Sequence, residues 1–181
     1  MGMIWILAAA LWGVAEATVF FIVPDVLLTF AVWRRGGRFA LQLAVIAAGA
    51  ASLAGIAMWY WGRSDPAGAA HIMLRIPAIG PDLLSRTARE MNGLWPLHLT
   101  LGAVTGVPYK LYAIAAGGHG IALLPFVIAS FGARLARFAL SVGLASLGAA
   151  VLKRLGRPQW QCPLLIAFWT LLYAIYFSLR A

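Results

Sequence analysis

The stretch "WGVAEATVFFIVPDVLLTF", from Trp12 to Phe30, is almost wholly apolar yet contains Glu16, Pro24 and Asp25. The whole chain has only five acidic residues, so two of them in one apolar run need a structural reason. Proline removes a backbone donor and clashes with the preceding helical turn, and Pro24 therefore predicts a break in this run. A carboxylate at mid-bilayer costs at least about 2.5 kcal/mol, so both acids should face protein or water rather than lipid.

The composition of the chain is that of a membrane protein. Of its 181 residues, 63% are apolar and 10% are charged, whereas about a quarter of an ordinary soluble domain is charged. Long apolar runs follow one another from end to end, over residues 1–33, 39–61, roughly 94–133, 138–152 and 163–179. The sequence thus predicts an all-α polytopic membrane protein.

The net charge of +9 comes mainly from clusters that border apolar runs. One basic cluster occupies residues 34–38 and another occupies residues 153–157. Cytoplasmic loops carry such an excess of Lys and Arg, so we expect both clusters on the cytoplasmic side. Topology explains this charge without nucleic-acid binding.

Residues 1–33 are too long for one simple crossing. A continuous helix would measure about 50 Å, against a hydrocarbon core of about 30 Å. In such a helix Glu16 and Asp25, nine residues apart, would lie on opposite faces. A re-entrant hairpin broken at Pro24 turns both acids inward, and we predict one over residues 1–33. The alternative is a tilted, kinked helix whose carboxyl groups lie near the two interfaces or stay protonated and hydrogen bonded.

The chain resembles itself in two places at nearly the same offset. "VPDVLLTFAV" from Val23 resembles "VPYKLYAIAA" from Val107, and "IAAGAASLAGI" from Ile46 resembles "IASFGARLARF" from Ile128. Each half is then a Pro-broken hairpin followed by a transmembrane helix, and the basic clusters give the halves opposite orientations. Such inverted repeats with broken helices are a transporter architecture.

These considerations predict a single membrane domain over residues 1–181. Its expected parts are a re-entrant hairpin (1–33), a transmembrane helix (39–61), an extracytoplasmic amphipathic segment (62–93), a second re-entrant hairpin (94–120), a transmembrane helix (121–152) and an extra C-terminal transmembrane helix (163–179).

Five ionisable residues fall inside apolar runs and are the candidate transport site: Glu16, Asp25, Lys110, Arg134 and Arg137. Arg134 and Arg137 share a helix face, so they could pair with the acids or hold a phosphate through forked hydrogen bonds. Pro24 and Pro108 are the structural breaks beside them. The alternative is that these charges neutralise each other only to fix the fold.

Other features predict no chemistry. No nucleophile elbow, phosphate-binding loop or zinc signature occurs, so we expect neither an enzyme, a cofactor nor a metal site. Small residues recur every four positions and indicate close helix packing: Ala47, Ala51, Gly55, Ser141, Ala145 and Ala149.

With both halves in view, the chain resembles the DedA superfamily of membrane proteins, also called the VTT or SNARE-associated Golgi protein family, and within it the small YqaA-like bacterial branch. The resemblance covers about Leu11 to Gly156 and is carried by Glu16, "FIVPDVLL", "YWGR", "GVPYKLYAIAAG" and "FGARLARF". The family's paired-arginine signature, Arg-Phe-x-Pro-x-x-Arg, is replaced by "TGVPYKL", with Lys110 near an arginine position.

The resemblance implies a bacterial inner-membrane protein that moves a phosphate-bearing lipid, undecaprenyl phosphate or a phospholipid, across the bilayer with help from the proton motive force. It implies that Glu16 and Asp25 match functional acids of the family. The expected partners are a lipid phosphate headgroup and protons, and homo-oligomerisation stays open. Two other functions stay open: a proton- or ion-coupled carrier of a small soluble solute, and a non-transporting membrane scaffold.

Overall fold

The computed structural model describes residues 2–18, 22–76 and 79–178, apart from the side chain of Phe177. Throughout these ranges the chain is helical with short connections, and they contain no β-strand. The helices are α1 (Gly2–Thr18), α2 (Asp25–Arg35), α3 (Gly37–Ser64), α4 (Pro66–Met73), α5 (Pro81–Glu90), α6 (Trp95–Thr105), α7 (Tyr109–Gly118), α8 (Leu123–Arg154), the 3-10 turn η1 (Pro158–Trp160) and α9 (Gln161–Ser178).

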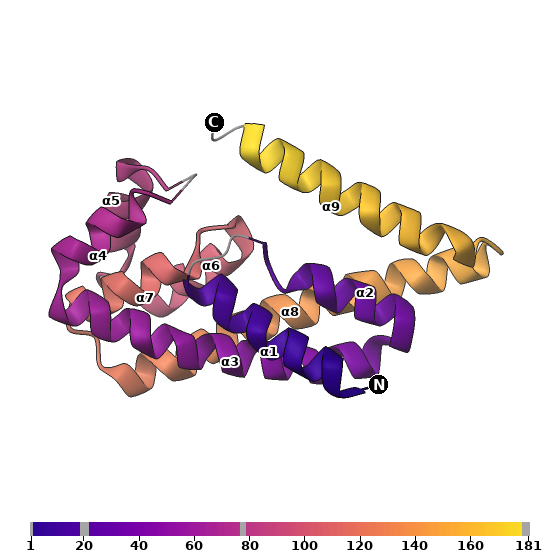
Figure 1. Ribbon diagram of the computed structural model, residues 1–181, viewed down its shortest axis with the longest axis horizontal. Helices are drawn as coiled ribbons and strands as arrows, with labels where there is room; N and C mark the ends of the chain where they lie inside the picture. The colour runs from indigo at the N-terminus through magenta and orange to yellow at the C-terminus, as the bar shows by residue number, and fades with distance from the viewer. Residues whose placement is uncertain (1, 19–21, 77–78, 179–181) are drawn as a thin grey trace.

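The two longest helices, α3 and α8, pack against each other and organise the rest (Figure 1). Helix α1 lies along α3, α7 packs on the other half of α3, and α2 packs against both long helices. Helices α4 and α5 gather at one end of the molecule, whereas the turn from α8 into α9 lies at the opposite end.

Two of the described helices are long and apolar enough to cross a membrane. They are α3, with 28 residues, and α8, with 32 residues. Helix α3 covers the expected transmembrane range 39–61, and α8 covers the expected range 121–152 from residue 123 onward. Helix α9 covers most of the third expected range, 163–179, although residue 179 lies outside the described part of the chain.

The predicted breaks coincide with helix starts. Pro24 directly precedes α2, and Pro108 directly precedes α7. Helix α6 is followed by Gly106, whose φ of 81° lies in the left-handed region that glycine adopts without steric cost. Two short helices followed by one long helix therefore occur twice along the chain, as α1, α2, α3 and as α6, α7, α8.

Glycine permits the closest helix contacts. A Cβ atom on Gly13 of α1 would come within 2.5 Å of the carbonyl oxygen of Ala47 on α3. A Cβ on Gly117 of α7 would overlap the carbonyl oxygen of Trp59, also on α3. Helices α1 and α7 thus pack directly against the backbone of α3, a close approach that small residues allow in membrane helices.

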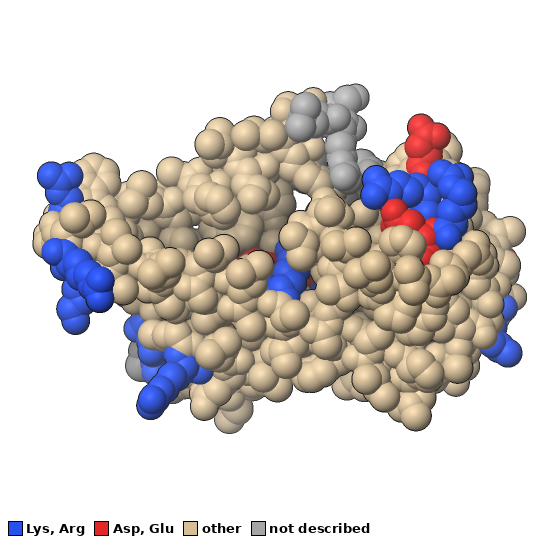
Figure 2. Space-filling model, turned by 180° about the vertical axis from the view of Figure 1, so that it is seen from behind, with Lys and Arg blue, Asp and Glu red and all other residues tan. Residues whose placement is uncertain are grey.

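Segment 62–93 contains an amphipathic helix, as expected for this stretch. In α5, Thr87 is buried and Leu83 and Leu84 pack against the core, whereas Arg86 and Arg89 are exposed. Figure 2 shows acidic and basic side chains mixed at this end of the molecule, and basic side chains alone at the end that holds the α8–α9 turn.

Candidate functional site

The first element of the site is an ion pair between α2 and α8. Arg137 donates a hydrogen bond to the Oδ2 atom of Asp25 over 2.8 Å, and Ser141 donates to Oδ1 over 2.6 Å. Asp25 is 1% exposed. The break at Pro24 places this carboxylate in the first turn of α2, where the helix dipole favours negative charge. Arg137 and Ser141 are one turn apart on α8, so both reach the same acid.

A second ion pair lies deeper, between α1 and α8. Arg134 donates to the Oε2 atom of Glu16, and both residues are buried, at 4% and 6% exposure. The guanidinium of Arg134 lies 4.4 Å from the centre of the Tyr109 ring, a cation–π contact. A buried arginine therefore has both a counter-ion and an aromatic surface.

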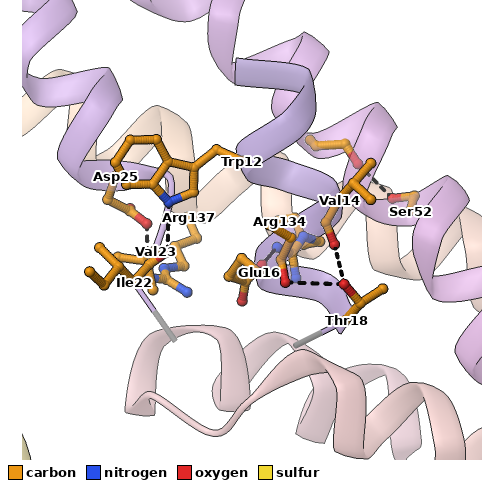
Figure 3. A network of polar contacts seen from close by, with 12 residues as sticks. Trp12, Val14, Glu16, Thr18, Ile22, Val23, Asp25, Ser52, Arg134 and Arg137 are labelled. Carbon is orange, nitrogen blue, oxygen red and sulfur yellow. Dashed lines mark hydrogen bonds and ion pairs between the residues drawn. The ribbon is translucent and has the colours of Figure 1, made fainter. Parts of the chain in front are cut away.

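The two pairs hold both sides of the same break (Figure 3). Glu16 precedes the Pro24 break and Asp25 follows it, and the two arginines that bind them are three residues apart on α8. Two residues before Pro24, the carbonyl oxygen of Ile22 accepts a hydrogen bond from the indole nitrogen of Trp12 over 2.7 Å. The interrupted backbone thus obtains a partner from side chains, as buried irregular backbone requires.

A cavity of about 490 Å³ opens beside these pairs. Its charged floor is formed by Glu16, Asp25, Lys110 and Arg137. Its walls are mostly apolar and come from α6, α8 and α9. Figure 2 shows red and blue atoms at the bottom of a hollow in the middle of the tan face. The cavity therefore combines ionic groups in its depth with an apolar surround.

Lys110 reaches this floor from the second break. It lies two residues after Pro108, at the start of α7, and is 1% exposed. Pro108 itself lines the cavity, as does Val23 beside Pro24. Both proline breaks therefore border the same cavity.

Helix α9 covers one side of the cavity. Its Trp169 indole donates to the Thr29 hydroxyl over 3.0 Å, and its Tyr173 hydroxyl accepts the backbone N–H of Val23 over 2.8 Å. Trp169 and Tyr173 are one turn apart and both line the cavity. The C-terminal helix is thus attached to α2 and to the residue that precedes Pro24.

The structure brings four of the five candidate residues to one cavity and places the fifth next to it. Arg134 lines a smaller adjoining cavity of about 20 Å³ together with Glu16.

Ser141 was interpreted as part of a packing stripe, but its hydroxyl binds Asp25. Its position four residues after Arg137 was the signal that could have placed it in the site. Nothing in the local sequence pattern indicated the roles of Trp12, Trp169 and Tyr173.

The chemistry available here is anion binding and proton exchange. Arginine and lysine side chains bind phosphate or carboxylate groups, and a buried carboxylate can exchange a proton with its surroundings. Within the described residues, no group of three or more His, Cys, Asp or Glu side chains is placed to hold a metal ion.

Comparison with protein-family models, with curated proteins and with solved structures finds no match for this chain. The site is therefore interpreted from its own geometry.

Proposed function

We propose that this protein is a membrane transporter that moves a phosphate-bearing lipid across the bilayer. The observation that carries the proposal is the cavity of about 490 Å³, which has ionic groups at its floor and apolar side chains at its walls. A lipid has the same division between a charged headgroup and apolar chains. In this account the headgroup passes over the floor while its chains remain in the hydrocarbon phase.

The charges of the site favour an anion. Three basic side chains (Lys110, Arg134 and Arg137) accompany two acidic ones (Glu16 and Asp25), which leaves one excess positive charge when all five are ionised. A phosphate monoester or diester supplies the missing negative charge, and arginine binds its oxygens through two parallel hydrogen bonds.

The mouth of the cavity suits acyl chains. Several large apolar residues line it and are also exposed on the surface: Val104, Leu140, Leu144, Phe168 and Leu172. Apolar side chains that are exposed in a membrane protein contact lipid rather than water. A chain attached to a bound headgroup can therefore leave the cavity sideways into the bilayer.

The short helices support re-entrant hairpins. Helices α2, α6 and α7 have 11, 11 and 10 residues, hence lengths of about 15 to 17 Å, roughly half a hydrocarbon core. Helix α1 has 17 residues and is longer, at about 25 Å. We propose that the hairpins of residues 1–33 and 94–120 enter from opposite sides and meet at the cavity. The basic clusters at 34–38 and 153–157 then lie in the cytoplasm, with a bacterial inner membrane as the location, and the chain is a DedA-like protein.

Proton exchange at Glu16 or Asp25 would couple the transport cycle to a proton gradient. Protonation of either acid removes the partner of an arginine, which then binds the lipid phosphate more strongly. Loss of the proton restores the ion pair and releases the headgroup. The proton therefore acts as a switch between ion pair and phosphate complex.

A second candidate is a non-transporting scaffold, because both arginines already have a carboxylate partner. In a scaffold the ion pairs would only fix the helices. A carrier of a small soluble solute is the third candidate. The apolar mouth of the cavity favours a lipid over a soluble solute.

Reconstitution tests the proposal. The protein is placed in vesicles that carry fluorescent phospholipid, and dithionite quenching reports lipid movement between leaflets. We expect faster movement than in protein-free vesicles, and faster still with a pH gradient. Movement at the protein-free rate under both conditions would contradict the proposal and favour the scaffold.

A further inference from the structure

A second polar network lies at the end of the molecule formed by α5 and α7. Glu90, the last residue of α5, accepts a hydrogen bond from the Tyr112 hydroxyl over 2.6 Å and pairs with Arg86 over 2.7 Å. Tyr112 is 1% exposed, whereas the side chain of Glu90 is 16% exposed and that of Arg86 is 60% exposed. Glu90 therefore joins a buried hydroxyl to the solvent-accessible edge of the molecule.

Between this network and the ion pairs lies the small cavity of about 20 Å³. Its lining includes five polar side chains: Glu16, Tyr109, Tyr112, Arg134 and Arg137. A water molecule needs at least about 10 to 15 Å³ measured in this way, together with two to four polar partners. The cavity meets both requirements for one water molecule and is too small for a lipid headgroup.

Two residues link the small cavity to its surroundings, one toward Glu90 and one toward the large cavity. Tyr112 lines the small cavity and also donates to Glu90. Glu16 lines the small cavity and also the floor of the large one. One water bound in the small cavity would therefore complete a chain of polar groups from the large cavity to the surface near α5.

We infer that the small cavity binds a water molecule and that this water, Tyr112 and Glu90 form the path by which protons reach Glu16 from the side of the membrane that α5 faces. The inference rests on the proposed function, because it assigns a route to the proton that drives the exchange at Glu16.

The transfer conserves atoms and charge. A proton from solvent first binds the Glu90 carboxylate. Once Glu90 is protonated, the Tyr112 hydroxyl hydrogen turns from Glu90 to the water. Tyr112 then accepts the proton from Glu90 and passes its own hydroxyl proton to the water, which transfers a proton to the Glu16 carboxylate. Glu90 is then again a carboxylate, Tyr112 and the water are unchanged, and Glu16 is a carboxylic acid.

The charged neighbours of both acids keep them ionised until a proton is supplied. Glu16 faces Arg134 and Arg137 of α8, Lys110 of α7 and, across the floor, Asp25 of α2. Protonation of Glu16 leaves its partner Arg134 as an added positive charge beside the cavity, which favours an anion there.

Glu90 faces Arg86 of its own helix, Tyr112 of α7 and His98 of α6, whose Nδ1 atom lies 2.8 Å from the Glu90 carbonyl oxygen. The hydroxyl and the cation both favour its ionised form, so Glu90 is a carboxylate at rest and holds a proton only briefly before passing it on.

Two variants remove one member of the path each. Tyr112→Phe keeps the ring and loses the hydroxyl. Glu90→Gln keeps an acceptor for Tyr112 but loses the carboxylate that takes up the proton. Tyr60→Phe is the matched control, because Tyr60 is 55% exposed on α3 and lines neither cavity. Thermal unfolding in detergent establishes that each variant is folded.

Proton and lipid movement are measured on the same vesicles, made of phosphatidylcholine and phosphatidylglycerol. A trapped pH dye reports proton entry driven by a valinomycin-induced potassium potential, and dithionite quenching reports lipid movement. We expect proton entry above that of protein-free vesicles with wild type and Tyr60→Phe, and a loss of about tenfold or more with Tyr112→Phe and Glu90→Gln.

Proton entry at the wild-type rate in both folded path variants would overturn the inference. So would wild-type protein that moves lipid but admits no protons, although the proposed function would then stand. Wild-type protein that admits protons through Tyr112 but moves no lipid would instead contradict the proposed function and leave the proton path intact.

Discussion

Arg137 on α8 donates to Asp25 at the start of α2 over 2.8 Å, joining two residues that are 112 positions apart in the chain. This contact connects the first proline break to the second half of the protein. Because the same two side chains form part of the floor of the large cavity, the contact that fixes the fold also shapes the site.

Breaking this pair on one side should be costly. Asp25→Asn leaves the guanidinium of Arg137 without its counter-ion, and we expect destabilisation of about 3 kcal/mol or more, as for other buried pairs that lose one partner. Thermal unfolding of the purified protein in detergent measures the effect.

The double variant Asp25→Asn with Arg137→Gln is the control. It removes both charges, so it should be more stable than the sum of the single losses predicts, by about 1 to 3 kcal/mol. Strict additivity of the two single variants would show that the pair contributes no coupling.

The close contact of α1 with α3 predicts a sharp difference between two glycines. Gly13→Ala introduces a methyl group 2.5 Å from the Ala47 carbonyl oxygen, and helix separation should lower stability by about 1 to 3 kcal/mol. Gly49→Ala, within α3, meets no atom within 4 Å and should be neutral or stabilising by up to about 1 kcal/mol. Equal unfolding temperatures for both variants would contradict this packing.

Blocking the mouth of the cavity should stop transport without unfolding the protein. Val104 lines the cavity and is 67% exposed, so Val104→Trp places an indole at the opening. We expect lipid movement to slow by about tenfold, which corresponds to about 1.4 kcal/mol in the barrier. Leu101→Trp is the control on the same helix, because Leu101 is 50% exposed and does not line the cavity. Equal rates for the two variants would exclude this opening as the lipid route.

Acid stability should depend on Glu90. Burial alone would raise the pKa of Glu90, but the hydrogen bonds from Tyr112 and Arg86 and the charge of Arg86 together lower it below its usual value of 4.5. A lowered folded-state pKa means that Glu90 contributes stability above about pH 4.5 and that this contribution is lost as the pH falls through the folded value.

Glu90→Gln should therefore unfold at a lower temperature than wild type at neutral pH, and the difference should shrink as the pH falls below about 4.5. Thermal unfolding of both proteins across this range measures it. A difference that stays constant with pH would show that the carboxylate charge contributes nothing to the contact.

Much of the fold was predictable because proline and hydropathy act locally. Pro24 and Pro108 predicted the two breaks, and α2 and α7 begin directly after them. The apolar runs predicted the long helices α3 and α8. Helix α4 was not predicted separately, because nothing distinguished its short run of small residues from the rest of the segment between α3 and α5.

The sequence predicted which residues belong to the site but not how they pair. The cost of charge in an apolar run identified the five candidates, but spacing along α8 could not say which arginine meets which acid. That choice depends on how α1 and α2 pack on α8. The contacts of Trp12 and Tyr173 depend on tertiary packing that no local pattern records.

The most direct test of the account is an experimental structure of the protein in lipid nanodiscs that contain phosphatidylglycerol. We predict density for a phosphate group on the cavity floor, within hydrogen-bond distance of Arg137 or Lys110, with acyl chains leaving past Val104 and Leu144. A cavity floor occupied only by the ion pairs, with every ordered headgroup at the outer surfaces of the bilayer, would contradict the account.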